Sequence, residues 1–309
     1  IMFKFIGQRV FRSILVMIGV SLVTFILLNI IPGDPVAVML QKRTDEATMN
    51  RVRHELGLDR PLHIQYLDFI TNAVKGNLGN SYFEKRPVSE MLLKSLETTL
   101  RLGLNVFIFA VISGITIGTL AAVFRGKMFD RVLMFISMLG ISEPAFWVAV
   151  LLQIFFGLRL RMFPISGMNA PNSFVLPTIA LGMRYVASIA RLTRTNVLEA
   201  LSQDYVVTAR SKGVREIFVI CIHVLKNASI PVVTLLGLEL KDILGGSMVV
   251  EAVFSLPGMG SLAINAIVAR DIPVVQGTVL FSAVMFVIVN LIVDLLYGLL
   301  DPRIRLEGV

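Results

Sequence analysis

The feature that most constrains this chain is a series of apolar runs, each long enough to cross a lipid bilayer. Ser13–Ile31 contains 19 residues without a charged side chain, and Leu102–Phe124 contains 23. A helix rises 1.5 Å per residue, so the shorter run covers about 28 Å, close to the thickness of a hydrocarbon core. Over the whole chain 55% of the residues are hydrophobic and the mean hydropathy is +0.79, too apolar for a water-soluble domain. The sequence therefore predicts an all-α membrane protein.

Six spans are predicted, and they divide the chain into three parts. The first run is too long for the core of a signal peptide, and no small-x-small cleavage pattern follows it, so we expect a retained span. Residues 33–97 are mixed polar and are expected to form a small extracytoplasmic subdomain at the membrane surface. The predicted parts are therefore 1–32, 33–97 and a core of 98–309. Spans three to six are expected at about Val132–Leu158, which Ser142-Glu143-Pro144 interrupts, and at Phe174–Ala190, Asn227–Val250 and Val274–Leu300.

The net charge of +8 is explained by basic segments between the apolar runs. A nucleic-acid-binding protein would gather these charges on one folded face, so no nucleic acid is expected as a partner. Basic residues cluster at the N-terminus, at 125–131, at 191–226 and near the C-terminus. The positive-inside rule then predicts that both termini are cytoplasmic. Cys221 is the only cysteine and the three histidines match no ligand spacing, so neither a disulfide nor a metal site is expected.

The most informative stretch lies between spans four and five, at residues 191–226. Residues 197–212 within it are too polar to span a membrane, and Gly213 follows them as a candidate C-cap. Apolar side chains recur there at helical spacing, at Val197, Leu201, Tyr205 and Val206. The pattern predicts a short amphipathic helix. Such a helix could lie on the lipid surface or dock to a partner protein, and the periodicity favours neither.

The same stretch carries a resemblance to a known family. Glu199-Ala200-Leu201, then Gly213, then Ile230-Pro231 resembles the EAA…G…I-x-x-P loop of ABC importer permeases, with the end of the motif shortened. Residues 204–213 are similar to the version found in dipeptide, oligopeptide and nickel permeases. The subunit resembled is the one with a long first outside loop, commonly the "B" member of a B/C pair. Further matches follow in the family's order over nearly the whole chain, at residues 31–35, 55–59, 244–247, 253–258 and 301–305.

The resemblance implies a type I ABC importer permease fold, with a cytoplasmic coupling helix between spans four and five. In that family the helix sits in a groove of an ATPase subunit and transmits its closure to the spans. The coupling residues implied are Glu199, Ala200, Leu201, Asp204, Tyr205, Ala209, Arg210, Lys212 and Gly213. The implied partners are a second permease, two ATPase subunits, an external solute-binding protein and the lipid of a bacterial or archaeal inner membrane. No GxxxxGK[ST] motif is present, so we expect no catalysis by this chain alone, and ATP and Mg²⁺ on the ATPase subunits.

Ionisable side chains also fall within or near the predicted spans. Each would cost about 2.5–3.5 kcal/mol at the bilayer centre, so they should face protein or water. We hypothesise that Glu143, Glu239 and Asp242 line the passage and favour a cationic or amine-bearing substrate. Members of the family usually carry uncharged residues at the positions of Glu143, Lys241 and Asp242, so these are departures. The alternative is a structural ion pair, for instance between Glu143 and Arg184, or contact with the partner permease.

Gly114 and Gly118 form a small-xxx-small pair in the second predicted span. Such a pair lets two helix backbones approach closely. The pattern predicts a tight helix–helix contact on this side of the span.

The leading functional hypothesis is half of the passage of an importer of short peptides, with nickel or a metal chelate as the next substrate. An intramembrane enzyme is the alternative from another class, but no GxSxG, HExxH or paired intramembrane aspartate motif is found. An ion-coupled secondary transporter would be expected to carry inverted repeats, and no internal repeat is evident.

Overall fold

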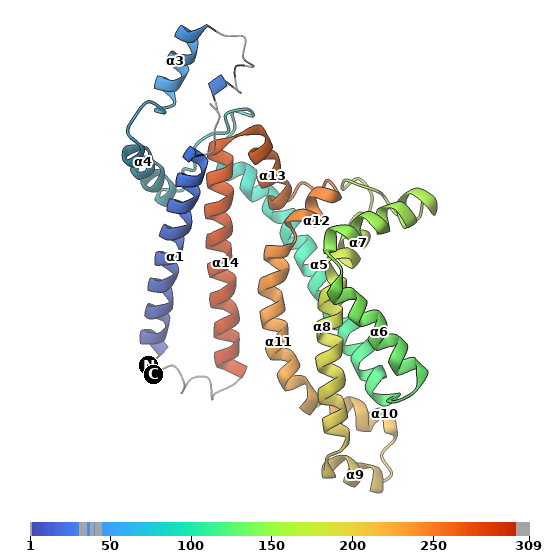
Figure 1. Ribbon diagram of the computed structural model, residues 1–309. Helices are drawn as coiled ribbons and strands as arrows, with labels where there is room; N and C mark the ends of the chain where they lie inside the picture. Colours follow the sequence, from blue (N-terminus) through green and yellow to red (C-terminus); the bar gives the residue numbers. More distant parts are fainter. Residues whose placement is uncertain (1, 31–35, 38–39, 41–44, 301–309) are drawn as a thin grey trace. The chain divides into compact units, whose positions relative to one another are not determined.

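The computed structural model describes residues 2–30, 36–37, 40 and 45–300, and within these ranges nearly every element is a helix (Figure 1). The chain groups into two compact units, one formed by residues 1–98 with 257–309 and the other by residues 99–256. The helices are α1 (Met2–Ile30), α3 (Glu46–Glu55), α4 (Leu62–Val74), α5 (Val88–Val123), α6 (Met128–Ser142), α7 (Ala145–Leu152), the π-helix η1 (Gln153–Arg159), α8 (Val175–Leu201), α9 (Asp204–Ser211), α10 (Glu216–Phe218), the π-helix η2 (Val219–Val224), α11 (Leu225–Gly246), α12 (Met248–Val253), α13 (Met259–Ala269) and α14 (Ile272–Leu300).

The membrane spans follow the predicted apolar runs. Among the described residues, five helices are long and apolar enough to cross a membrane, or six if a bent pair counts as one span. The bent pair is Met128–Gly140 with Ala145–Arg159, which turns by more than 40° at the predicted break. Pro144 explains the break, because it lacks an amide hydrogen and disfavours helical geometry in the residue before it. Glu143 accordingly has an extended backbone (φ −94°, ψ 137°).

Helix α8 is the centre of the 99–256 unit. It packs against α5, α6, α7 and α11, and most of its membrane-spanning window is buried. The predicted glycine contact is confirmed: a Cβ on Gly114 would lie 2.7 Å from Ile189 Cβ, and one on Gly118 would lie 2.4 Å from the Ala190 carbonyl oxygen. Only glycine permits this approach of α5 to α8.

The other unit is held by contacts between its first and last parts. Val88 and Leu92 of α5 pack with Met259, Val274 and Val275 in one apolar cluster. At the start of α14, the Ser81 hydroxyl donates a hydrogen bond to Asp271 Oδ2 (2.5 Å) and the Tyr82 amide donates to Oδ1 (3.1 Å). Burial, with a smaller effect of the nearby Asp271 carboxylate, raises the pKa of the Tyr82 phenol to about 12. These bonds fasten the end of the 33–97 segment to the last span.

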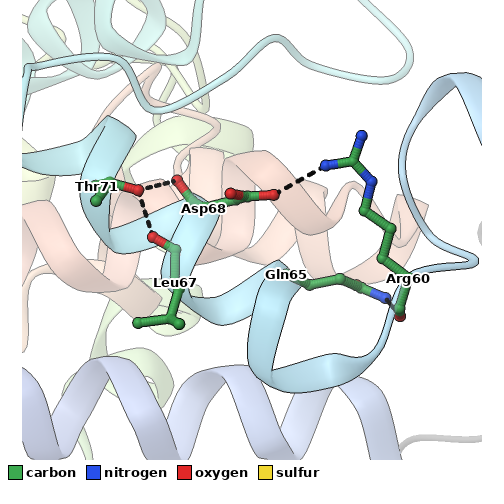
Figure 2. Close-up of polar contacts among 5 residues, drawn as sticks. All are labelled: Arg60, Gln65, Leu67, Asp68 and Thr71. Carbon is green, nitrogen blue, oxygen red and sulfur yellow. Dashed lines mark hydrogen bonds and ion pairs between the residues drawn. The ribbon is translucent and has the colours of Figure 1, made fainter.

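Segment 33–97 is more helical than the sequence analysis predicted. Helix α4 was not predicted at all, and α5 begins at Val88, within the proposed loop. Figure 2 shows one polar side of α4, where Arg60 Nη1 lies 3.1 Å from Asp68 Oδ2 and the Gln65 amide donates to the Arg60 carbonyl (2.8 Å). On another side, Tyr66 stacks edge-on against Phe25 of α1, with ring centroids 5.4 Å apart.

Segment 255–272 combines a short turn with a helix. The turn is confined to the residues before Met259, and α13 then runs for 11 residues as an apolar helix. Pro257 and Gly258 lie before this helix, where they define its start instead of breaking it.

Candidate functional site

The loop between α8 and α11 contains two helix segments where one was predicted. The expected helix at 197–212 is wrong in its extent: α8 continues to Leu201, and α9 is a separate helix of eight residues from Asp204 to Ser211. The Ser202 hydroxyl donates to the Glu199 carbonyl (2.7 Å), a local bond that competes with continuation of the helix. The spacing of apolar residues continues from α8 into α9 because apolar residues of both helices pack into one cluster.

That cluster, here called the α9 cluster, is formed by small and β-branched apolar side chains from five helices of the unit. Val206 and Ala209 enter it from α9 and are buried. Its other members come from the end of α5, the end of α8, η2 and the start of α11: Ala122, Val197, Ala200, Val219, Val224 and Ala228. Since the apolar side of α9 is covered by its own protein, α9 is anchored to three spans at once.

The opposite side of α9 is exposed and mostly polar. Asp204, Tyr205, Val207 and Arg210 are exposed, as are Glu199, Lys212 and Gly213 on either side of the helix. Of the nine implied coupling residues, Ala200 and Ala209 are instead buried in the α9 cluster, and Leu201 is half-buried. The structure therefore divides this residue set into an exposed side and a buried side.

The end of α9 is fixed by a local motif and an ion pair. Gly213 has φ +76°, its amide donates to the Arg210 carbonyl (2.9 Å), and the Val214 amide donates to the Ala209 carbonyl (3.3 Å). This is a Schellman C-cap, as Gly213 predicted. Both guanidinium nitrogens of Arg210 that face Glu216 contact its carboxylate, at 2.5 and 3.1 Å. The hydrogen-bonded carboxylate raises the pKa of Arg210 above its usual value, so the pair stays charged.

An ion pair near the C-terminal end of α8 was not predicted from the sequence. Arg194 donates to both oxygens of Asp130 at 2.8 Å, and the Gly126 amide donates to Asp130 Oδ2 at 3.0 Å. The Asp130 side chain is buried and joins the start of α6 to α8. The two residues are 64 positions apart, so their pairing leaves no local pattern. The one available signal was an acid in the first turn of a helix, beside an otherwise basic turn.

A second missed group is Glu251 on α12, which is fully buried. Its carboxylate accepts a hydrogen bond from the Thr99 hydroxyl at 2.8 Å. Its sequence setting, an apolar run before a turn, gave no sign that a carboxylate would be enclosed there. It fixes α12 against α5.

The membrane charges do not gather as the sequence analysis suggested. Glu239 and Asp242 lie on α11 facing α8, where Glu239 is 9% exposed and hydrogen-bonds with the Ser188 side chain. Arg184, named above as an example partner for Glu143, instead lies 3.8 Å from Asp242. Glu143 itself is half-buried at the bend after α6. Two of the three proposed lining residues are thus brought together, and with an arginine.

Two family descriptions match the chain, and together they cover most of it. "Binding-protein-dependent transport system inner membrane component" matches residues 114–306, and the corresponding N-terminal description matches residues 2–103. The first match includes α8, α9 and α11, and so contains the whole candidate site.

Similar proteins include transport permeases over their full length. The "Putative peptide transport system permease protein" of Brucella abortus (strain 2308) is 40% identical over 97% of this chain and 98% of its own. The "Glutathione transport system permease protein GsiC" of Salmonella choleraesuis is 40% identical over 98% and 99%.

Two solved structures share the fold. The MetNI methionine ABC transporter in an inward-facing conformation matches with a TM-score of 0.56 at 16% identity, over 68% of this chain and 96% of its own. An amino acid ABC transporter with histidines matches with a TM-score of 0.51 at 21% identity, over 67% and 93%.

Proposed function

Because the chain belongs to the family of binding-protein-dependent transport system inner membrane components, and is a multi-pass permease subunit of an ABC importer, we propose that it forms half of a passage for short peptides. Its full-length relatives are named for peptide and for glutathione transport. Glutathione is itself a short peptide, so both names favour peptides over nickel. The family membership also leaves no support for an intramembrane enzyme or an ion-coupled secondary transporter.

In this proposal the chain works with partners that supply energy and substrate. A second permease completes the passage, two ATPase subunits bind ATP and Mg²⁺, and an external solute-binding protein delivers the peptide. Both termini and α9 lie on the cytoplasmic side, as the basic segments indicate. Residues 33–97 and the segment from Glu251 to Pro273 face the binding protein.

The observation that carries the mechanism is the enclosure of α9's apolar side within its own unit. A helix that lies on lipid needs its apolar side free to enter the headgroup region. Val206 and Ala209 are not free, since they are buried against α8, η2 and α11. The exposed side, with Asp204, Tyr205 and Arg210, is suited to a groove of a partner protein.

Because α9 is anchored to the spans, movement of the ATPase subunits can be transmitted through α9 to the passage. Packed interiors are dense and shift as units, so a push on α9 moves the cytoplasmic ends of α5, α8 and α11 together. The Asp130–Arg194 pair extends this unit to the start of α6. Closure of the ATPase subunits would thereby become rotation of several spans.

Two neighbouring residues separate docking from anchoring. Val206 is buried in the α9 cluster and Val207 is 57% exposed. In the complete importer, reconstituted in proteoliposomes with its binding protein, Val206→Ala is expected to lower the number of peptides transported per ATP hydrolysed, with the ATPase still bound. Val207→Ala is expected to weaken ATPase association and leave that ratio unchanged.

The same assay can contradict the proposal. If wild-type importer takes up no short peptide in an ATP-dependent manner, the proposed substrate is wrong. If Val206→Ala and Val207→Ala have the same effect on both readouts, α9 does not divide into an anchoring side and a docking side.

A further inference from the structure

Arg184 and Asp242 form an ion pair within the membrane-spanning part of the 99–256 unit. Arg184 lies nine residues into α8, about 14 Å from its first residue. Asp242 lies in the last turns of α11, and both residues fall within the candidate spans Val175–Leu201 and Glu216–Ile243. Even so, their side chains are 59% and 63% exposed. Charged side chains within a span are costly to expose to lipid, so Arg184 and the carboxylate beside it are expected to face water or protein.

The Arg184–Asp242 pair is longer and more exposed than the Arg194–Asp130 pair of the same unit. Arg194 and Asp130 share two hydrogen bonds of 2.8 Å, and their side chains are 26% and 6% exposed. Arg184 and Asp242 share one contact of 3.8 Å, at the limit for an ion pair. A guanidinium has five N–H donors and a carboxylate about four acceptor positions, so one long contact leaves most of this capacity available.

A second carboxyl group, that of Glu239, lies close to the pair. Glu239 is on α11 one helical turn before Asp242, is 9% exposed, and interacts electrostatically with both Arg184 and Asp242. The Arg184 guanidinium also lies 5.4 Å from the centre of the Tyr185 ring, which orients it beside α11. Adjacent positive and negative groups with unused hydrogen-bonding capacity match a ligand that carries both charges.

We propose that Arg184, Asp242 and Glu239 form a bipolar binding site in the passage for the charged ends of a short peptide. Arg184 binds the terminal carboxylate through paired N–H donors, and Asp242 binds the terminal ammonium, with Glu239 one helical turn away on α11. This inference rests on the proposed function, because it places the substrate of that passage. It also revises the hypothesis of a purely cation-selecting lining, since Arg184 adds the complementary charge.

The test measures equilibrium binding of three probes to the complete permease–ATPase complex in nanodiscs, without the binding protein. The probes are dialanine, N-acetyl-dialanine, whose blocked amine carries no charge, and dialanine amide, whose blocked carboxyl group carries none. Wild-type complex is expected to bind dialanine about tenfold more tightly than either blocked form, the size of effect that one charged hydrogen-bonding partner supplies.

Each substitution is expected to remove one preference only. Asp242→Asn removes the preference for dialanine over N-acetyl-dialanine and retains the preference over the amide. Arg184→Gln does the reverse, and Arg184→Lys, which keeps the charge, retains part of the carboxylate preference. Asp68→Asn is the matched control, because Asp68 on α4 forms an exposed ion pair with Arg60, and its substitution should change neither preference.

Three results overturn the inference: no saturable binding of dialanine to the wild-type complex, equal binding of the three probes, or variants that weaken all three probes equally. The last result identifies a structural ion pair, which thermal unfolding of the same variants reports separately. ATP-dependent uptake of dialanine with the binding protein present is measured in parallel. Its absence refutes the proposed function, whereas uptake with unchanged end preferences refutes only the bipolar site.

Discussion

Two spans of similar length, α1 and α8, are opposites in polarity and in burial. The most apolar 18-residue stretch of α1 has a mean hydropathy of 2.5, and 11% of that stretch is buried. The corresponding stretch of α8 has a mean hydropathy of 1.2, and 61% of it is buried. In water the more apolar helix would be the more buried one. In a bilayer the surrounding solvent is apolar, so the more apolar helix can face it and the less apolar helix is enclosed by protein.

The composition of each helix explains how this is achieved. Buried positions of α8 include Ala180, Gly182, Ala187 and Ala190, whose small side chains let neighbouring helices approach. The face of α1 between Phe11 and Ile30 carries large exposed aliphatic side chains. In this chain, low hydropathy combined with small residues is found in α8, the helix at the centre of the 99–256 unit.

The largest expected effect comes from filling the contact between α5 and α8. Gly118→Leu places a side chain where a Cβ alone would lie 2.4 Å from a backbone oxygen, and we expect it to lower the free energy of unfolding by about 3 kcal/mol. Gly19→Leu on α1, where nothing lies within 4 Å, is expected to be near neutral. Unfolding in mixed micelles at increasing sodium dodecyl sulfate would compare them. Equal losses would remove the distinction between the two helices.

A smaller effect is expected from shortening one isoleucine on each helix. Ile189 on α8 is fully buried, so Ile189→Ala should cost about 2 kcal/mol in the same unfolding measurement. Ile26 on α1 is 45% exposed, and Ile26→Ala should change stability little. A larger loss for Ile26→Ala would indicate that another protein, and not lipid, covers that face of α1.

The smallest expected effect concerns one arginine on each helix. Arg194→Gln removes both hydrogen bonds to the buried carboxylate of Asp130 and should cost about 1.5 kcal/mol. Arg12→Gln removes an exposed charge from α1 and should be within the error of the measurement. The double variant Arg194→Gln with Asp130→Asn should be less destabilised than the sum of the two single variants, and strict additivity would contradict a direct interaction.

The features that could be predicted from the sequence are those set by local pattern. Apolar runs gave the spans, Pro144 gave the break in the third, and Gly213 gave a helix end that the structure confirms. The helix contact at Gly114 and Gly118 could also be predicted, because the spacing of the two glycines is itself what lets α5 approach α8 closely.

The features that could not be predicted depend on residues distant in sequence. The break between α8 and α9 at Ser202 was not predicted, because the apolar period continues across it into one shared cluster. The Arg184–Asp242 and Arg194–Asp130 pairs each join two helices, and neither pairing was predicted. Which charge meets which is decided by helix packing, which a single sequence does not display.

The central claim is that the exposed side of α9 docks on an ATPase subunit while its buried side holds the spans. The most direct test attaches a photoactivatable crosslinker to Tyr205→Cys in a Cys221→Ser background, in the complete importer in native membranes. Tyr205 is 37% exposed, and Cys221 is the only native cysteine. We predict that the crosslinker captures the ATPase subunit, whereas the same crosslinker at Val206→Cys captures residues of this chain. Capture of lipid alone from position 205 would contradict the claim.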